Sequence, residues 1–313
     1  MSATLSKKNT KLGLIGIGLM GSRFLRRLNA EGWNVRGWNR SKGATLPLEK
    51  YGLQIEETLA GLVGESDVLL SSLADDNAVR TVYLGENGVF TYVKPQTIIL
   101  EMSTISPDLS ALLHQEAAQR GVHLLDLAVS GSTPAVDAGT VTLFAGGEPE
   151  IFDRCIPLFE SIAMQWYRMG PATAGIRMKL VVNLLLGIGM EAIAEAVSLG
   201  EHLKLDRDIL LDVLPKTAVI APAFSGKFSK IRNADYSPQF PLHLMCKDVN
   251  LAQSAANQSN VELPAARAAA QVFNEALAEA GQLDISSIVP FVFALAGQRS
   301  ENRPPSGKGK HQI

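Results

Sequence analysis

The first half of the chain alternates between short apolar runs and amphipathic segments. Residues 11–16 form an apolar run that ends in a glycine-rich turn, and residues 22–31 then place apolar side chains three and four positions apart. A short apolar run bounded by turn residues predicts a buried strand, and a spacing of three and four predicts an amphipathic helix. We expect this alternation up to residue 172, which predicts an α/β fold with a parallel sheet covered by helices on both faces. The strands are predicted at residues 11–16, 34–38, 67–72, 97–102, 122–127, 139–147 and 165–169.

The second half of the chain has no strand pattern and predicts only helices. Residues 174–205 form one long, mostly apolar segment, and a Gly-Pro pair at residues 170–171 precedes it. Because such a pair interrupts regular structure, we place a domain boundary there. Shorter helices are predicted at 206–214, 242–258, 264–280 and 286–296. The predicted organisation is a flexible N-terminus over 1–10, an α/β domain over 11–172, an all-α domain over 173–299 joined to it by the long helix, and a disordered tail over 300–313.

Lys179 and Asn183 interrupt the apolar first half of the long helix. Lys179 and Asn183 are four positions apart, so they lie one turn apart on one face. Burial among apolar neighbours would take water from the Lys179 ammonium, which lowers its pKa and makes its proton easier to donate. This favours a general acid. The alternative is a lysine that packs its stem on apolar surface and keeps its ammonium in water.

The turn after the first strand has the spacing of a dinucleotide-binding loop. Its three glycines follow the predicted strand and open the predicted helix. In a strand–turn–helix–strand unit, they permit a tight turn, the approach of a pyrophosphate to the helix N-terminus, and close packing of helix on strand. The alternative is an ordinary turn. We predict that the whole loop binds the cofactor: Gly16, Ile17, Gly18, Leu19, Met20 and Gly21.

The end of the second strand bears on which dinucleotide is bound. A chain that binds NAD would place an Asp or Glu there for the ribose 2′-hydroxyl. Residues 37–42 contain no acid, and Arg40, Ser41 and Lys42 offer charge and donors that suit a 2′-phosphate. We therefore expect NADP (NADPH) in preference to NAD, unless these residues form only a solvated turn.

Polar residues follow three further strands, at 72–75, 103–104 and 130–132. Ligands of such sheets bind at the carboxyl ends of the strands, so these segments are candidates for the site. Ser130, Gly131 and Ser132 offer small hydroxyls and backbone amides for a carboxylate or carbonyl oxygen.

Composition narrows the classes of protein and partner. The 313 residues are 46% hydrophobic and 19% charged, which is typical of a globular protein, and the net charge of −2 gives no general attraction to nucleic acid or anionic membranes. The two cysteines, Cys155 and Cys246, are far apart and expected to be reduced, as in a cytoplasmic protein. The chain starts without a secretory signal, and Asn183 and Glu191 interrupt its longest apolar run, so we expect no membrane span. Nor does the sequence show a cluster with metal-ligand spacing, so no metal is expected.

Five motifs occur in the order found in a known family. They are GIGLMG at 16–21, EMSTISP at 101–107, DLAVSG at 126–131, GIRMKLVVN at 175–183 and KDVNLA at 247–252. Together they resemble the β-hydroxyacid dehydrogenase family, the group of 3-hydroxyisobutyrate dehydrogenase, over about residues 11–298. The turn at 39–41 and the spacing at 179–183 are most similar to the glyoxylate/succinic semialdehyde reductase branch. The resemblance implies an NADP-binding Rossmann domain, an α-helical C-terminal domain used in dimerisation, and an active site in the cleft between them.

The resemblance also implies roles for single residues. By position, Lys179 would protonate the substrate oxygen during hydride transfer, and Asn183 would help to orient the carbonyl. The remaining residues would bind ligands: Ser130, Gly131 and Ser132 the substrate carboxylate, Thr104 both nicotinamide and substrate, Phe240 and Asp248 the substrate, and Asn39, Arg40, Ser41, Leu73 and Lys247 the cofactor.

Two residues of the substrate loop depart from the family pattern. Ala128 stands where relatives often have Pro, and Thr133 stands where they often have Lys or Gln. Substrate identity is therefore the property that the resemblance fixes least.

The leading hypothesis is an NADPH-dependent reductase that converts a small carboxylate-bearing aldehyde, of the glyoxylate or succinic semialdehyde type, to the hydroxyacid. A close alternative is a 3-hydroxyacid dehydrogenase of the 3-hydroxyisobutyrate or tartronate semialdehyde type. A 6-phosphogluconate dehydrogenase is disfavoured because no basic cluster suits a sugar phosphate, and an imine reductase usually lacks a lysine at position 179. The histidine-based dehydrogenases are disfavoured because no histidine lies in a strand-end motif. A non-catalytic NADP-binding protein is the last alternative, against which Lys179 argues. We expect a small-molecule ligand and a homodimer or homotetramer, with neither nucleic acid nor membrane as partner.

Overall fold

The computed structural model describes residues 4–44, 48 and 52–301, so the predicted disordered tail lies outside the described residues from position 302 onward. The chain divides into two compact units. The first is Met1–Leu184 with Lys247–Glu262, and the second is Leu185–Cys246 with Leu263–Ile313. The units divide within the long helix, whereas the sequence placed the boundary before it, because the first turns of that helix pack with the first unit.

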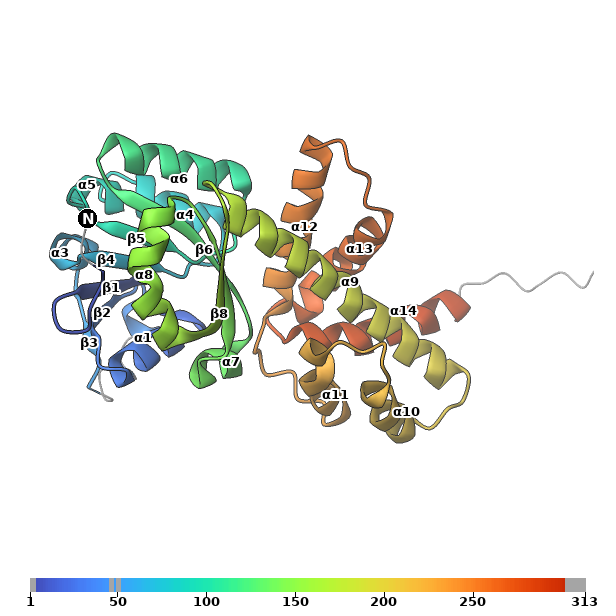
Figure 1. The fold of residues 1–313 in the computed structure, drawn as a ribbon. Coiled ribbons are helices and arrows are strands. Elements are labelled where there is room, and N and C mark those ends of the chain that lie inside the picture. The colour runs from blue at the N-terminus through green and yellow to red at the C-terminus, as the bar shows by residue number, and fades with distance from the viewer. Residues whose placement is uncertain (1–3, 45–47, 49–51, 302–313) are drawn as a thin grey trace, which may run out of the picture. The chain divides into compact units, whose positions relative to one another are not determined.

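The first unit is built on an eight-stranded sheet of order β3-β2-β1-β4-β5-β6-β7-β8 (Figure 1). The strands are β1 (Lys11–Ile15), β2 (Asn34–Trp38), β3 (Gln54–Ile55), β4 (Val68–Ser71), β5 (Ile98–Glu101), β6 (His123–Ser130), β7 (Val141–Gly146) and β8 (Ala163–Gly170). Strands β1 to β6 pair in parallel, as predicted. The chain order reverses at β1, which lies between β2 and β4. In such sheets this is where a crevice for ligands opens at the carboxyl ends.

One pairing differs from the predicted parallel sheet, because β7 runs antiparallel to β6. Only residues 131–140 connect these two strands, and a parallel crossover needs a dozen or more. The short connection contains only the six-residue helix α7, so the chain must return in the opposite direction. Strand β8 then pairs in parallel with β7 after a longer helical connection.

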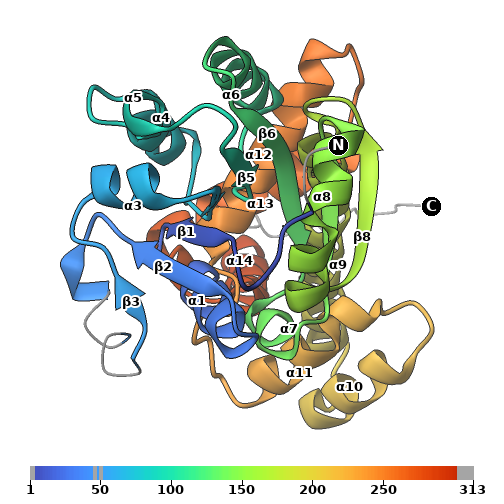
Figure 2. The same ribbon diagram turned by 60° about the vertical axis from the view of Figure 1, so that its left-hand side comes forward.

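Helices cover both faces of the sheet (Figure 2). Helix starts follow ordinary capping: the Ser106 hydroxyl accepts from the Leu109 amide, with Pro107 in the first turn. The short helices α3, α5, α7 and α11 were not predicted. The helices of the described chain are α1 (Gly21–Ala30), α3 (Leu59–Glu65), α4 (Asp76–Leu84), α5 (Val89–Tyr92), α6 (Pro107–Gln119), α7 (Thr133–Ala138), α8 (Pro149–Ile162), α9 (Ala174–His202), α10 (Arg207–Val213), α11 (Ser225–Arg232), α12 (Leu242–Gln258), α13 (Pro264–Ala280) and α14 (Ile288–Glu301).

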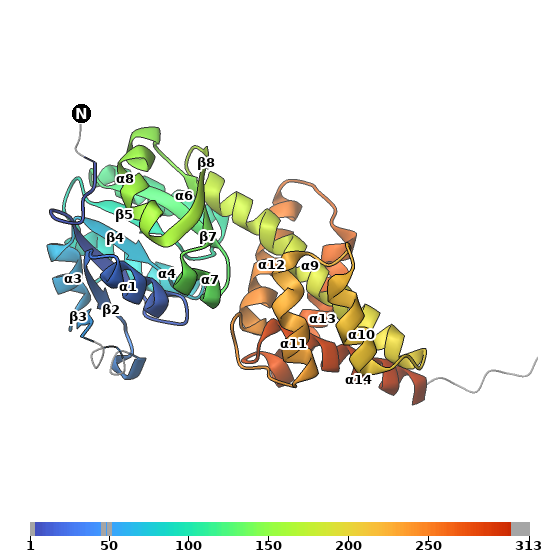
Figure 3. The ribbon, with the colours of Figure 1, turned by 60° about the horizontal axis from the view of Figure 1, so that its bottom comes forward.

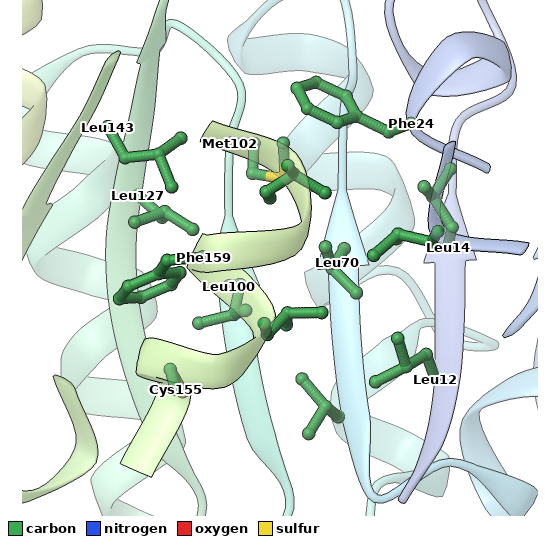
Figure 4. Close-up of a cluster of buried hydrophobic side chains, with 14 of the residues drawn as sticks. Leu12, Leu14, Phe24, Leu70, Leu100, Met102, Leu127, Leu143, Cys155 and Phe159 are labelled. Carbon is green, nitrogen blue, oxygen red and sulfur yellow. The ribbon is translucent and has the colours of Figure 1, made fainter. Parts of the chain in front are cut away.

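Each face of the sheet has its own apolar core. On one face, leucines of β1, β4, β5, β6 and β7 pack against α1 and α8, which contribute Phe24 and Phe159 to the cluster (Figure 4). On the other face, the alternate side chains pack against α3, α4, α5 and α6. Strands buried on both sides explain the continuous apolar runs in the sequence. The start of α9 belongs to this second face through Ile176.

Residues 4–10, within the segment predicted to be flexible, contact the first unit. The Leu5 side chain is buried in the first core, and its amide donates to the Arg154 carbonyl over 3.1 Å. The Ser6 amide donates to the Thr10 hydroxyl. One apolar side chain in an otherwise polar tail is enough to anchor it, and the sequence alone gave no partner for that side chain.

The second unit is helical in its described residues (Figure 3). A buried ion pair fixes its interior: Lys227 Nζ on α11 lies 2.8 Å from both carboxylate oxygens of Asp284. Asp284 also accepts from the amides of Gln239 and Phe240, just before α12. This carboxylate therefore ties α11, the segment before α12 and the turn before α14 to one another.

Helix α9 corrects the expectation that no segment is long and apolar enough to cross a membrane. With 29 residues and a mean hydropathy of 1.8 in its most apolar window, it is the one described helix that could do so by length and composition. The core helix of a soluble protein meets the same criterion. Within α9, the buried Asn183 is hydrogen-bonded to another helix, as expected for a core helix.

Two glycine-to-alanine substitutions are expected to change stability in opposite directions. A Cβ on Gly175, in the first turn of α9, would lie 2.4 Å from the Asp126 carbonyl oxygen and 2.5 Å from that of Phe144. Gly64 in α3 has open space at the same position, and alanine is favoured there by about 0.5–1 kcal/mol. We expect Gly64→Ala to stabilise by that amount and Gly175→Ala to destabilise by about 1–3 kcal/mol. Urea unfolding measures both, and equal effects would contradict the close approach of α9 to the sheet.

Candidate active site

The glycine loop joins β1 to α1 at the carboxyl edge of the sheet. Gly16 has φ of +90°, and its amide donates to the Trp38 carbonyl over 2.9 Å. A Cβ on Gly21 would lie 1.9 Å from the Gly16 carbonyl oxygen, so only glycine allows this helix to begin so close to the turn. Gly18 has open space instead, which a ligand could approach. Among the described residues, the amides of residues 18–21 donate to no protein acceptor. Free amides at a helix N-terminus fit the pyrophosphate of a dinucleotide.

Asn39 joins the glycine loop to the turn after β2. Its Oδ1 accepts from the Ile17 amide at 3.0 Å, and its Nδ2 donates to the Ser41 carbonyl at 3.0 Å. Both ends of the Asn39 amide are therefore used by the protein, which makes it a brace for the loop. Arg40 is exposed beside it. Leu19 is exposed as well, while Ile17 is buried.

The carboxyl ends of the parallel strands carry a row of buried polar side chains. The register aligns Ile15, Ser71, Glu101 and Asp126 across β1, β4, β5 and β6. Residues in register point to the same face, so these side chains all lie on the face covered by α4 and α6. Ser71 and Glu101 end β4 and β5, and Asp126 lies within β6, which continues to Ser130.

Glu101 organises the loops that follow β4 and β5. One oxygen accepts from the Ser103 amide at 2.7 Å, and the other accepts from the Ser71 hydroxyl, which also contacts Tyr83. The Ser103 hydroxyl in turn accepts from the Leu73 amide at 2.8 Å. Burial raises the pKa of Glu101, and its hydrogen bonds offset only part of this effect. The network therefore sets the backbone of Leu73, and through Ser103 that of its neighbour, Thr104.

Lys179 and Asn183 of α9 lie with the start of α12. Asn183 is 1% exposed, and its Nδ2 donates to Asp248 Oδ2 over 2.5 Å. The Lys247 ammonium lies 3.0 Å from Asp248 Oδ1 and donates to the Thr104 carbonyl. The structure thus brings together five predicted site residues from three segments far apart in sequence. Asn183 Oδ1 is buried and has no hydrogen-bond partner among the described residues, so it is an acceptor available to a ligand or a neighbouring donor.

The pKa of Lys179 is lowered from 10.5 to about 8. Burial is the largest cause, and the positive charge of Lys247 adds to it, while the Asp248 carboxylate acts in the opposite direction. The side chain nevertheless stays partly accessible. A lysine with a pKa near 8 can hold a proton at neutral pH and also give it up.

Asp126 fixes the start of α9 against the sheet. Its Oδ1 accepts from the Thr173 amide at 2.8 Å and lies 2.9 Å from His114 Nε2, while its Oδ2 accepts from the Ile176 amide at 2.8 Å. The sequence analysis singled out neither Asp126 nor Glu101 as a functional residue. The signal that could have found them is a carboxylate within an otherwise apolar strand.

Ser130, Gly131 and Ser132 follow the same strand. Ser130 ends β6, Gly131 has φ of +146°, and Ser132 precedes the first turn of α7. All three are at least partly accessible. Phe240 belongs to the second unit, where its amide donates to Asp284, so the first unit does not contain it.

Two other features of the described residues bear on the site. A pocket of about 370 Å³ opens at the amino ends of the strands, lined by residues such as Lys11, Asp67 and Ile98. It lies at the opposite edge from the predicted residues and contains a mixture of charges. No group of three or more His, Cys, Asp or Glu in the described chain is placed to hold a metal ion.

Two family models match the chain. The NAD binding domain of 6-phosphogluconate dehydrogenase matches residues 11–170, and the NAD-binding domain of NADP-dependent 3-hydroxyisobutyrate dehydrogenase matches residues 173–292. The chain belongs to the β-hydroxyacid dehydrogenase family. This confirms the resemblance and the predicted order of a Rossmann domain followed by a helical domain.

Members of the β-hydroxyacid dehydrogenase family with curated names align with nearly the whole chain. 2-(Hydroxymethyl)glutarate dehydrogenase of Eubacterium barkeri is 32% identical over 285 residues, which are 90% of this chain and 95% of that protein. Glyoxylate/succinic semialdehyde reductase 1 of Arabidopsis thaliana is 29% identical, over 90% of this chain and 98% of that protein. The crystal structure of 3-hydroxyisobutyrate dehydrogenase from Salmonella typhimurium is 26% identical with a TM-score of 0.83, over 90% of this chain and 100% of that one. This β-hydroxyacid dehydrogenase is therefore an NAD(P)-dependent oxidoreductase that acts on CH–OH groups.

Glu101→Gln is expected to remove a pH dependence of stability. The raised pKa of Glu101 means that the wild type loses stability as pH rises above the ordinary value of 4.5 and through the raised one. Because glutamine does not ionise, the free energy of unfolding of the variant should increase relative to that of the wild type as the pH rises. Urea unfolding between about pH 5 and pH 9 measures the difference. The exposed Glu86→Gln is the control, and a pH-independent difference for Glu101→Gln would refute the expectation.

Proposed function

We propose that this chain is an NADPH-dependent reductase of small aldehydes that bear a carboxylate, of the glyoxylate or succinic semialdehyde type. The observation that carries the proposal is the Lys179 ammonium, whose pKa burial lowers to about 8, in the group that contains Asn183 and Asp248. A carbonyl reduction needs a proton donor for the oxygen, and a lysine with this pKa supplies one near neutral pH. A protein that only binds a dinucleotide has no use for such a group.

In this proposal, different residues of the chain bind the cofactor, bind the substrate and donate the proton. The free amides of residues 18–21 bind the pyrophosphate of the cofactor. A bound reduced nicotinamide supplies the hydride. The hydroxyls and amides of residues 130–132 hold the substrate carboxylate, which places the carbonyl oxygen at Lys179 Nζ. Lys179 donates its proton to that oxygen, and Asn183 Oδ1, the free buried acceptor, orients the ammonium or the substrate.

Lys247 and Asp248 hold this arrangement in place. The Lys247 ammonium joins α12 to the Thr104 carbonyl, beside which we place the nicotinamide. The negative charge of Asp248 favours the charged form of Lys179, so the ammonium stays protonated at neutral pH despite its burial.

The second candidate function is the reverse reaction, oxidation of a 3-hydroxyacid. It is supported by the same lowered pKa, because a lysine near 8 can also accept the hydroxyl proton. The two directions differ in their pH dependence, since reduction needs charged Lys179 and oxidation needs the neutral amine.

We further propose a homodimer or homotetramer in the cytoplasm. Exposed apolar residues recur along α9, at Val181, Leu185 and Leu199, and Leu203 follows the end of the helix. A stripe of this kind on a long helix is typical of an interface.

The first experiment measures NADPH consumption with glyoxylate, succinic semialdehyde, tartronate semialdehyde and methylmalonate semialdehyde for the wild type and Lys179→Ala. Turnover of at least one aldehyde is expected, with a loss of roughly 100-fold or more in the variant. The rate of reduction should fall as pH rises through about 8, and the rate of hydroxyacid oxidation should rise over the same range. Arg177→Ala, exposed two residues earlier on the helix, is the control. Turnover that survives Lys179→Ala would remove Lys179 from the mechanism.

Cofactor choice is tested at Arg40. This arginine is exposed beside the glycine loop, where no acid is present to bind a 2′-hydroxyl. Arg40→Ala is expected to lower the preference for NADPH over NADH by about 10- to 100-fold, the amount that a charged hydrogen bond contributes. The ratio of kcat/KM for the two cofactors measures it, with the exposed Arg80→Ala as control. An unchanged ratio would mean that Arg40 belongs to a solvated turn.

A further inference from the structure

We propose that Asp126 is a positioning residue for the reaction: it sets the start of α9 and thereby the place of Lys179. The inference rests on the proposed function, because Lys179 is the proton donor there. Asp126 itself acts through the helix and touches no ligand in this proposal.

The contacts of Asp126 are unusual for a strand residue. Its side chain is 2% exposed, and each carboxylate oxygen accepts from a different backbone amide at the beginning of α9. The Thr173 amide lies just before the helix and the Ile176 amide lies in its first turn. A helix leaves its first amides without intrahelical partners, and a negative charge at this end also complements the helix dipole. Strand β6 thus supplies the cap that a residue of the helix's own chain segment normally provides.

The backbone around this cap is closely packed and conformationally restricted. Thr173 has φ of +73°, a left-handed conformation that a threonine adopts only when its surroundings hold it there. A Cβ on Gly146 would lie 2.5 Å from Asp126 Oδ1, and one on Gly175 would lie 2.4 Å from the Asp126 carbonyl oxygen. The helix therefore begins in direct contact with the sheet, at a place that Asp126 determines.

Lys179 lies between two such anchors. It follows Ile176 by three positions, which is about 4.5 Å along the helix axis, and precedes the anchored Asn183 by four. The upstream anchor is the Asp126 carboxylate and the downstream one is Asp248. A shift or fraying of the first turn moves Lys179 almost directly, since less than one turn separates it from Ile176.

His114 of α6 completes the carboxylate's surroundings. Its Nε2 lies 2.9 Å from Asp126 Oδ1, and its side chain is largely buried. The histidine contacts the same oxygen as the Thr173 amide, so the chain of contacts runs from α6 through β6 to α9. Its replacement weakens the same anchor without removing the acceptor for the two amides.

The test compares Asp126→Asn with Asp67→Asn. Asp67 also accepts from a backbone amide, that of Lys11 at 2.8 Å, but at the opposite edge of the sheet, so it controls for loss of a carboxylate–amide bond. For Asp126→Asn we expect kcat to fall about 10- to 100-fold, the effect of a misplaced catalytic group, while the Kd for NADPH changes less than about threefold. Asp67→Asn should keep kcat. If Asp126→Asn does not fold, His114→Gln should give a smaller fall in kcat with the same unchanged Kd.

A second readout does not depend on turnover. The pH dependence of amine labelling at Lys179, followed by mass spectrometry of its peptide, reports the pKa of that group. Loosening of the first turn admits water, so the pKa should rise from about 8 toward 10.5 in Asp126→Asn and stay near 8 in Asp67→Asn. A folded Asp126→Asn with wild-type kcat and labelling would overturn the proposal and leave Asp126 a stabilising residue. If the wild type reduces none of the aldehydes, the proposed function fails, and the labelling still decides whether Asp126 positions Lys179.

Discussion

The register of the parallel strands is the constraint on which the site depends. It places Ser71, Glu101 and Asp126 side by side on one face, where β4 and β5 end and where the parallel pairing of β6 with β5 ends. Buried carboxylates need hydrogen bonds, and Glu101 and Asp126 each accept them from a segment outside the sheet. Glu101 collects the loops after β4 and β5, and Asp126 collects the start of α9. Hydrogen bonds to this polar row therefore fix the positions of the adjoining loops and of the start of α9 relative to the sheet.

The balance of charges around Lys179 follows from the same geometry. An isolated ammonium in an apolar setting would lose its proton, and an ammonium in a full ion pair would hold it too firmly to donate. The Asp248 carboxylate also binds Asn183 and Lys247, and the positive charge of Lys247 opposes the effect of the carboxylate on the pKa of Lys179. The result is a pKa of about 8, between these extremes. The neighbours of a buried ionisable group thus affect its pKa partly through the other groups that they bind.

Local patterns in the sequence were sufficient for most of the fold and for the glycine loop. Strand β2 and helices α12 and α13 lie where hydrophobic periodicity predicts them, and the loop glycines have the close contacts that their spacing implies. Hydrogen-bond partners far apart in the sequence could not be predicted from local patterns. The donors to Asp126 are 47 and 50 positions away, and no periodicity links them. The reversal of β7 was missed because it depends on the length of a connection. The cofactor role of Asn39 stays a prediction, and periodicity gave no sign that both ends of its side-chain amide bind the protein.

The reversal at β7 has a consequence for how such an enzyme can diversify. The five strand pairings from β3 to β6 are parallel and buried, and a change there would disturb the whole sheet. The segment between β6 and β7 leaves the sheet and returns within ten residues, held at its ends by one antiparallel pairing. Exposed positions of residues 131–140 can therefore exchange side chains with little cost to the sheet, whereas Thr133 and Val136 are buried. Of the two departures from the family pattern, Thr133 lies in this segment and Ala128 lies in β6, where it pairs with Phe144. The architecture separates a part that mutation must conserve from a short part in which new substrate preferences can arise.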